Sequence, residues 1–257
     1  MDFEFIRYEK RDRIAWVTIN RPEVMNALHP PANDELARVW DDFAADPDVW
    51  VAILTGAGEK AFSAGNDLKY TALHGVPRMP KGGFGGLVAR HDLVKPLIAA
   101  VNGFALGGGL EIALACDIIV AAEHARFGLP EPRVGLMAAA GGVHRLPRHI
   151  PLKVAMGMML SARPISAAES ARFGLVNEVV PASDLLPAAE RWAAAILECS
   201  PLAVQATKQC ALEGLGKPVA EAMAAPYPAM VRLFSSEDAS EGPRAFAEKR
   251  KPVWRGR

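Results

Sequence analysis

The chain has 257 residues, of which half are apolar and 23% are charged, the balance of an ordinary globular protein. Lys plus Arg and Asp plus Glu both number 29, so no excess charge predicts binding to nucleic acid or to an anionic membrane surface. The three cysteines are scattered and lack paired spacing, which argues against a disulfide framework and against a zinc site.

The N-terminal sequence MDFEFIRYEKRDR is charged from its second residue and lacks the apolar segment of a secretory signal. No apolar run in the chain approaches the roughly 18 residues that a membrane span requires. We therefore expect a cytoplasmic globular protein without a membrane partner, of a size typical of enzymes.

The N-terminal part of the chain carries strand and helix patterns in alternation. RIAWVTINRP at 13–22 alternates apolar and polar residues and predicts a strand that ends in a turn. ANDELARVWDDFAADPD at 32–48 spaces its apolar residues as an amphipathic helix that stops before Pro47. VWVAILTGAGEKAF at 49–62 predicts a buried strand that opens into a glycine turn.

The middle of the chain continues this alternation. The Gly75–Gly86 segment, with five glycines and two prolines, predicts a mobile loop. Buried strands are expected at 96–109 and 117–123, and a short apolar helix at 109–117 lies between them.

Helices dominate from residue 141 to the C-terminus. We expect them at 141–149, 151–161, 166–173, 185–199, 201–213, 218–234 and 237–249, the last with a break at Gly242-Pro243. This order predicts an α/β core with a helical C-terminal extension. The last helices are apolar over much of their circumference, so we expect them to pack on the core or on a neighbouring subunit.

The segment GGGLEIALACD is the strongest chemical signal in the sequence. Its glycines allow the backbone to approach a ligand closely, and the helix that follows leaves its first N–H groups without intrahelical partners. Such a helix start stabilises an anion, and it forms half of an oxyanion hole if the anion exists only in a transition state.

Glu111 lies in the first turn of this predicted helix. A glutamate at that position commonly does no more than complement the helix dipole. However, the residues that follow it are apolar on every side of the helix, which predicts a buried helix. Because an unpaired buried carboxylate is costly, we interpret Glu111 as catalytic.

Glu131 lies between Pro130 and Pro132, and the following proline predicts an extended conformation at Glu131 in a stiff loop. Taken alone, Glu131 is typical of a glutamate in a solvent-exposed turn. Together with Glu111 it becomes a candidate partner, because two carboxylates in different environments can divide the roles of acid and base.

Two weaker patterns follow the strand at 49–62. The small residues Ser63, Ala64 and Gly65 could turn their N–H groups towards a ligand, although small residues are also common loop material. Gly56-x-Gly58-x-x-Ala61 has the outline of a dinucleotide fingerprint. The helix and second acidic strand that the fingerprint requires do not follow, so we do not expect NAD.

Six segments, in order along nearly the whole chain, resemble the enoyl-CoA hydratase/isomerase (crotonase) family. They are INRPEVMNAL, AFSAGNDLK, KPLIAAVNGFALGGGLEIALACDIIVAAEHARFGLPE, AGGVHRLPR, ARFGLVNEVVP and EGPRAFAEKRKPVW. The resemblance implies an α/β fold, the crotonase-type spiral of ββα units. It implies a core with an acyl-CoA site at 1–199, and a helical region at 200–257 that mediates trimers, commonly paired into hexamers.

The resemblance also implies the residues of the site. The N–H groups of Ala64 and Gly108 would hold the thioester oxygen, and Glu111 and Glu131 fall at the positions of the two glutamates that hydratases use. It implies no metal and no cofactor apart from the CoA of the substrate. The expected contacts to substrate and CoA are Ala64, Gly65, Asn66, Asp67, Leu68 and Gly108.

We therefore predict an enoyl-CoA hydratase-type lyase, in which Glu111 takes a proton from water and Glu131 delivers one to C2. The alternatives are an isomerase or a thioester hydrolase of the same family, or a noncatalytic RNA-binding member, which the zero net charge disfavours.

The acyl group is less determined by the sequence. FSAGNDLK, GGFGGL, GGVHRLP and the C-terminal SEDASEGPRAFAEKRKPVWRGR look most like members that interconvert carnitinyl-CoA and crotonobetainyl-CoA. A trimethylammonium group favours aromatic faces, for which Phe84 and Trp254 are candidates. Ala138 stands where the family usually has proline, which we expect to loosen the acyl pocket. Candidate cations for the CoA 3′-phosphate are Lys69, Lys249 and Arg250.

Overall fold

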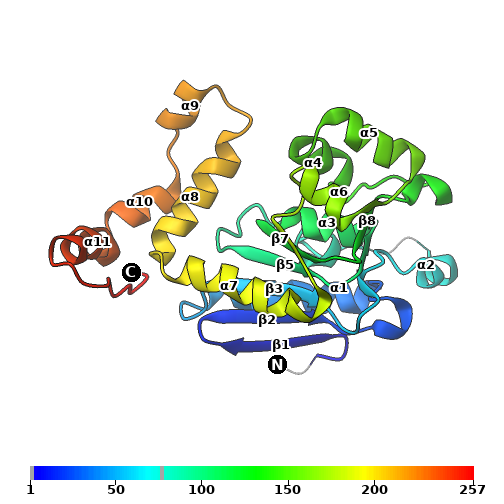
Figure 1. The fold of residues 1–257 in the computed structure, drawn as a ribbon, viewed down its shortest axis with the longest axis horizontal. Coiled ribbons are helices and arrows are strands. Elements are labelled where there is room, and N and C mark those ends of the chain that lie inside the picture. Colours follow the sequence, from blue (N-terminus) through cyan, green and yellow to red (C-terminus); the bar gives the residue numbers. More distant parts are fainter. Residues whose placement is uncertain (1–2, 76–77) are drawn as a thin grey trace.

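The computed structural model describes residues 3–75 and 78–257, in which strands and helices alternate before a C-terminal series of helices (Figure 1). The strands are β1 (Ile6–Arg11), β2 (Ile14–Ile19), β3 (Val51–Gly56), β4 (Ala61–Ser63), β5 (Leu97–Val101), β6 (Phe104–Leu106), β7 (Ile118–Ala122), β8 (Arg126–Gly128), β9 (Ile165–Ser166) and β10 (Glu178–Val180). The helices of the core are α1 (Pro30–Ala45), α2 (Leu68–His74), α3 (Gly108–Ala115), α4 (Gly142–His149), α5 (Leu152–Ser161), α6 (Ala167–Arg172) and α7 (Leu185–Leu197). Those of the C-terminal region are α8 (Pro201–Gly214), α9 (Val219–Ala224), α10 (Pro228–Phe234) and α11 (Glu237–Ala247).

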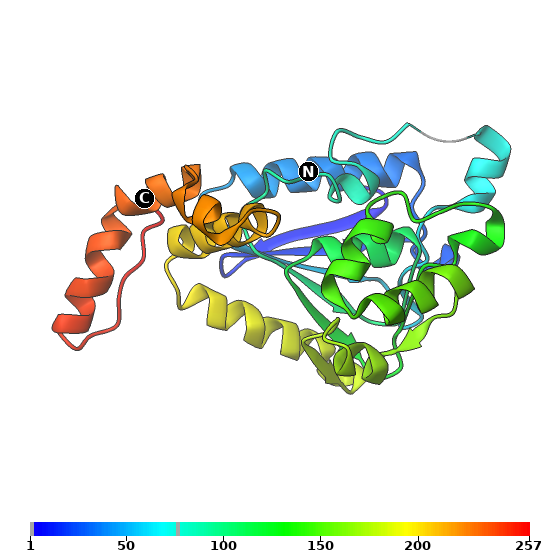
Figure 2. The ribbon, with the colours of Figure 1, turned by 90° about the horizontal axis from the view of Figure 1, so that it is seen from above.

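A six-stranded sheet forms the centre of the core, in the order β1-β2-β3-β5-β7-β10. β1 and β2 are antiparallel, and the neighbours from β2 onward are parallel. The helix α7 packs on one face through small residues such as Ala189, while α1 covers the other with Trp40 and Phe43 (Figure 2). Because both faces are covered, the central strands are apolar without alternation.

A smaller sheet, in the order β4-β6-β8-β9, packs beside the first. The strands β3, β5 and β7 belong to the large sheet, and the strand that follows each of them belongs to the small one. A helix or helical turn comes next each time, so the chain repeats a ββα unit. This is the spiral that the resemblance implies.

The structure divides two segments that we expected to be single strands. The segment 49–62 forms β3 and β4, and 96–109 forms β5 and β6. In both cases the chain turns at a glycine and passes from one sheet to the other, which apolar periodicity does not reveal. The strands β1, β8, β9 and β10 and the short helix α2 were not predicted.

The expected loop at Gly75–Gly86 contains a short 3-10 helix, η2 (Phe84–Gly86), and its residues 76–77 lie outside the described residues. Phe84 is buried, so the end of this segment belongs to the core. The prediction of a mobile loop therefore does not hold for residues 84–86.

Two predictions for the C-terminal helices were wrong. The segment 218–234 is two helices, α9 and α10, because Pro226 and Pro228 interrupt the backbone hydrogen bonds between them. The helix α11 instead runs through Gly242-Pro243 without a break. Pro243 is exposed, and the buried Asp238 ties the helix down by accepting hydrogen bonds from the backbone of the C-terminal tail.

Candidate active site

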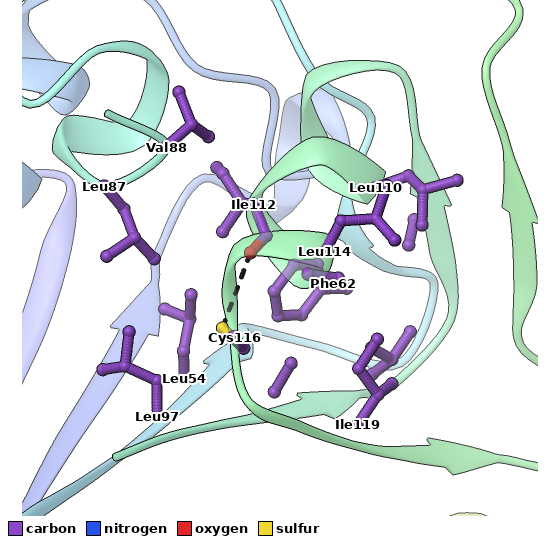
Figure 3. Packing of buried hydrophobic residues seen from close by; sticks show 14 of the residues in the cluster. Leu54, Phe62, Leu87, Val88, Leu97, Leu110, Ile112, Leu114, Cys116 and Ile119 are labelled. Atoms are coloured by element: carbon purple, nitrogen blue, oxygen red, sulfur yellow. Dashed lines mark hydrogen bonds between the residues drawn. The ribbon is translucent and has the colours of Figure 1, made fainter. Parts of the chain in front are cut away.

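The helix α3 is the element around which the site forms. Its side chains Leu110, Ile112 and Leu114 are buried, and they pack among Phe62 and other apolar residues (Figure 3). The thiol of Cys116 at its C-terminal end donates to the carbonyl of Ile112 at 3.5 Å. The helix is thus held on all sides, and its N-terminal turn has a fixed position.

Two of the backbone N–H groups that lack a hydrogen-bond acceptor among the described residues come from different segments that meet beside this turn. They belong to Gly108, the first residue of α3, and to Asn66, which follows β4. The N–H of Ala64, which the resemblance implies as a donor to the substrate, instead donates to the carbonyl of Met25 at 3.0 Å. The structure therefore contradicts the prediction for Ala64 and leaves the amide of Asn66 as the available donor.

Gly65 brings these two amides together. It adopts φ +86°, and a Cβ at this position would lie 2.7 Å from the nitrogen of Gly108 and 2.8 Å from the carbonyl oxygen of Leu106. Only glycine accepts both this conformation and this approach. The loop after β4 thus lies directly on the first turn of α3.

The carboxylate of Glu111 is buried, with 3% of the residue exposed. Its Oε1 accepts a hydrogen bond from the N–H of Gly142, at the start of α4, at 2.8 Å. Burial raises the pKa of Glu111 from 4.5 to about 7, while hydrogen bonds from Gly142 and Ala140 act in the opposite direction. Glu111 is therefore poised to exchange a proton near neutral pH.

Glu131 approaches the same turn from the other side. Its Oε1 would lie 3.1 Å from a Cβ at Gly107, the residue before α3. Its Oε2 is buried and has no hydrogen-bond partner among the described residues. Burial raises the pKa of Glu131, which favours the protonated carboxyl group.

The backbone of Glu131 differs from the prediction. Glu131 is the first residue of a 3-10 helix, η3 (Glu131–Val134), and is not extended. Pro132 occupies the second position, where a missing N–H costs the helix no hydrogen bond. The rigidity expected from the two prolines is present, but it takes the form of a helical turn.

The predicted residues thus converge on one turn of one helix. Glu111 belongs to this turn, and the N–H of Glu111 donates to the carbonyl of Gly107. The carboxyl group of Glu131 faces Gly107 from outside the helix. The charge of Glu131 contributes to the raised pKa of Glu111, which is consistent with this proximity. An acid, a base and two free amides around one point can polarise a carbonyl group and move two protons beside it.

The other predicted contact residues line the loop after β4. The side chain of Asn66 donates to the hydroxyl of Thr71 at 2.9 Å. Asp67 caps α2 by accepting from the N–H of Tyr70, and it forms an ion pair with Arg21 at 3.1 Å. Leu68 is exposed. The side chains of Asn66 and Asp67 therefore shape the loop, and the backbone is left to face a ligand.

Sequence reasoning missed the residues that hold Glu111. The start of α4 lies against it so closely that a Cβ at Gly142 would be 3.0 Å from its Oε1. The pair Gly141-Gly142 at the start of the helix predicted for 141–149 was the available signal, because a helix N-terminus binds a carboxylate. Ala138, where proline was expected, is buried and lies beneath Gly142.

The candidate cations for a CoA phosphate are distributed over the chain. Arg250 is already engaged with Glu241 and Glu248. Lys69 is exposed on α2 and Lys249 follows α11, and these two helices lie at opposite ends of the protomer (Figures 1 and 2).

Among the residues that the structure describes, no group of three or more His, Cys, Asp or Glu side chains is arranged to hold a metal ion. In the same residues, no helix combines the length and the apolar character needed to cross a membrane.

The chain was compared with known proteins. The enoyl-CoA hydratase/isomerase family model matches residues 9–257. The chain is 42% identical to (E)-benzylidenesuccinyl-CoA hydratase of Thauera aromatica, over 98% of the chain and 99% of that protein. It is also 42% identical to carnitinyl-CoA dehydratase of Salmonella paratyphi A, over 99% of each.

Solved structures give the same result for the fold. The crystal structure of enoyl-CoA hydratase from Mycobacterium tuberculosis H37Rv superposes with a TM-score of 0.93 at 42% identity, over 98% of this chain and 99% of that one. An enoyl-CoA hydratase from Bacillus anthracis superposes with a TM-score of 0.88 at 34% identity, over 99% of this chain and all of the other.

Proposed function

The chain belongs to the enoyl-CoA hydratase/isomerase family, and from this premise we propose the reaction and the residues that perform it. The protein is an enzyme of the enoyl-CoA hydratase type, which adds water across the C2–C3 double bond of an acyl-CoA thioester or removes it. The observation that supports this reaction most is the pair of partly desolvated carboxyl groups, one on the first turn of α3 and one facing it from η3, beside two free amides.

The two amides supply the electrostatic part of the proposed mechanism. When water attacks C3, negative charge develops on the thioester oxygen as an enolate forms. The N–H groups of Asn66 and Gly108 lack other acceptors and would donate to that oxygen. Removing one such donor typically costs about 2.7–4 kcal/mol of transition-state stabilisation.

The two glutamates divide the proton transfers. Glu111 accepts a hydrogen bond from Gly142 at the N-terminus of α4, which partly opposes the effect of burial and keeps its ionised form accessible near neutral pH, so it takes the proton from the attacking water. Glu131 has an orphan buried oxygen, which favours its protonated form, so it delivers the proton to C2. Water contributes its oxygen and one hydrogen to C3, and Glu111 takes its second proton. Exchange of protons with solvent then restores an ionised Glu111 and a protonated Glu131 before the next turnover. These steps call for no metal and no redox cofactor.

Incubation with short 2-enoyl-CoA thioesters tests this proposal. We expect reversible loss of the enoyl-thioester absorbance and formation of the 3-hydroxyacyl-CoA, identified by mass and chromatography. A shifted double bond or free CoA would assign the chain to an isomerase or a hydrolase instead.

Variants test the assigned residues. Glu131→Gln and Glu111→Gln should each lower kcat by about 10²- to 10⁴-fold while CoA-thioester binding is kept. The matched control is Glu123→Gln, which changes an exposed glutamate after β7 and should leave kcat as in the wild type. Near-normal turnover in either test variant contradicts the role given to that residue.

The relatives differ in the substrate for which they are named, benzylidenesuccinyl-CoA for one and carnitinyl-CoA for the other. Of the two aromatic residues that we considered for a trimethylammonium group, Phe84 lies beside Gly108. Trp254 packs on Gly242 in the C-terminal tail and donates to the carbonyl of Glu198. Trp254 is thus remote from the site within one protomer.

We further propose that residues 200–257 form the surface on which protomers assemble into a trimer or a pair of trimers. The large side chains Leu215, Met223, Phe234 and Phe246 are each more than 70% exposed there. Assembly would cover them, and it would allow Lys249 to reach the site of a neighbouring protomer. A mass measured in solution tests the stoichiometry.

The unpaired thiols of Cys116, Cys199 and Cys210 agree with a cytoplasmic location.

A further inference from the structure

A cavity of about 1110 Å³ opens at the C-terminal end of α3. The apolar walls come from Leu87 in the segment between α2 and β5, Leu97 in β5, Leu114 in α3 and Leu212 in α8. The helix α4 supplies Arg145 and Arg148. Neither Glu111 nor Glu131 lines the cavity, and the proposed mechanism does not use it.

This cavity begins where the proposed site ends. Phe84 lines it, and the ring of Phe84 also covers Gly108, where a Cβ would lie 2.4 Å from its Cε1. Ala140 and Gly141 line it as well, and they directly precede Gly142, whose N–H donates to Glu111. An acyl chain whose thioester oxygen is held at Gly108 would therefore extend past Glu111 into this space.

The charged groups of the cavity are not equivalent. Arg90 is neutralised by Asp41 at 2.7 Å and Asp92 at 3.0 Å, and Lys208 is neutralised by Asp117 at 2.7 Å. These ion pairs leave no net positive charge for a ligand.

Arg145 is the exception. It is partly buried and donates to the carbonyl of Val88 at 2.7 Å, but it has no carboxylate within ion-pair distance among the described residues. Its Nη1 lies against Gly141, at the end of the cavity nearest Glu111. A guanidinium group has five N–H donors in a planar fork, so most of its hydrogen-bonding capacity is unused.

Acidic groups that could attract a cation are almost absent from the described lining. Asp117 is already paired, and Glu213 lies on the exposed wall of α8, where Gln209 donates to it. Arg148 and His144 face the cavity from the same helix as Arg145 and are basic. The charged side chains that line the inner end of the cavity are therefore basic, and the carboxylate of Glu111, which does not line the cavity, acts on Arg145 only from beyond ion-pair distance.

We propose that the cavity binds an acyl group that ends in a carboxylate, and that Arg145 recognises this carboxylate. A bidentate ion pair would satisfy the free donors of Arg145, and the apolar walls would strengthen it by excluding water. The same charge would repel a trimethylammonium group. The inference rests on the proposed function, because it assumes that the acyl chain of a CoA thioester enters from Gly108.

Binding of saturated thioesters, which cannot be hydrated, tests the inference separately from the reaction. We expect adipyl-CoA, which ends in a carboxylate, to bind about 10- to 100-fold more tightly than hexanoyl-CoA in titration calorimetry. γ-Butyrobetainyl-CoA, which ends in trimethylammonium, should bind more weakly than hexanoyl-CoA. Equal binding of all three, or tightest binding of the trimethylammonium ester, overturns the inference even if the protein hydrates enoyl-CoA.

Variants separate recognition from a structural role of Arg145. Arg145→Met should abolish the preference for adipyl-CoA over hexanoyl-CoA, and Arg145→Lys should keep part of it. Lys153→Met, which removes one positive charge from the exposed surface of α5 outside the cavity, should keep it fully. If Arg145→Met weakens both thioesters equally, Arg145 only supports α4 and Glu111, and the inference is wrong.

Failure of the proposed function has a different signature. In that case adipyl-CoA would still bind preferentially, but none of the corresponding 2-enoyl thioesters would be hydrated.

Discussion

The core and the C-terminal helical region differ in whether their large apolar side chains are buried or exposed. In the core, Phe43 and Phe62 are fully buried, whereas in the C-terminal region Phe234 is 74% exposed and Phe246 is 87% exposed. The glycines differ in the same sense. A Cβ at Gly109 would lie 2.1 Å from the carbonyl oxygen of Ser63, while a Cβ at Gly216 would meet nothing within 4 Å.

This difference separates two kinds of constraint. In the core, the chain's own contacts fix which residue a position accepts, and the active-site turn has its shape because of these contacts. In the C-terminal region, apolar residues lack partners within the protomer, so their identity points to contacts beyond it. Substitutions in the core should therefore change the protomer, and substitutions in the C-terminal region should change its assembly.

The largest expected effect comes from the glycine pair. Gly109→Ala would place a methyl group on the backbone of Ser63, so α3 and β4 would have to separate. We expect the free energy of unfolding to fall by about 3 kcal/mol, with loss of activity because both amides move. Gly216→Ala should change it by less than about 0.5 kcal/mol. Denaturant titration of both variants measures these changes. Similar losses of unfolding free energy at the two positions would contradict the difference between the core and the C-terminal region.

An effect of similar size but opposite sign is expected from Glu111→Gln at alkaline pH. Because the folded state raises the pKa of Glu111 from 4.5 to about 7, ionisation destabilises the wild type as pH rises through this window. The full cost above pH 7 is on the order of 2–3 kcal/mol. Glutamine can still accept from Gly142 without ionising, so the variant should be more stable than the wild type at pH 8.

The same variant should match the wild type below the window, where the carboxyl group is neutral in both states. Thermal denaturation at pH 8 and at pH 4 measures both limits. A variant that is less stable than the wild type at both pH values would show that ionisation of the buried Glu111 does not destabilise the fold.

The pH dependence of catalysis provides a smaller and more specific test. Glu111 must be ionised to take a proton from water, so kcat/KM should rise with pH to a midpoint near 7, well above the ordinary value of 4.5. The two carboxyl groups interact, so this midpoint belongs to the pair. If kcat/KM already reached its plateau below pH 5.5, burial would not raise the pKa of the catalytic base.

The smallest effect on the protomer is expected at the C-terminal surface. Phe246→Ser replaces a side chain that is already in solvent, so the unfolding free energy of an isolated protomer should change by less than about 0.5 kcal/mol. The assembled form should nevertheless dissociate at higher protein concentration than the wild type does. Light scattering over a dilution series measures this, with Leu73→Ser on the exposed face of α2 as the control.

Much of the core was predictable because local pattern and tertiary contact agree there. The buried runs of β3 and β5 and the amphipathic period of α1 have the lengths and apolar spacing of their elements. The division of each long apolar run between two sheets was not predictable. A glycine turn has the same sequence pattern whether the next strand pairs in the same sheet or passes to a second sheet. Strands of two or three residues, such as β9, carry no periodic signal at all.

The site divides in a similar way. The sequence by itself determined that Glu111 would be buried and that the amide of Gly108 would be free, because both follow from a glycine-led helix with apolar sides. Only the tertiary structure decided that Ala64 donates to Met25 and leaves the role to Asn66, that the start of α4 supports Glu111, and that Arg145 forms no ion pair among the described residues. A backbone N–H, a helix end and a guanidinium group acquire their partners from segments distant in the chain, and no local pattern specifies which segment arrives.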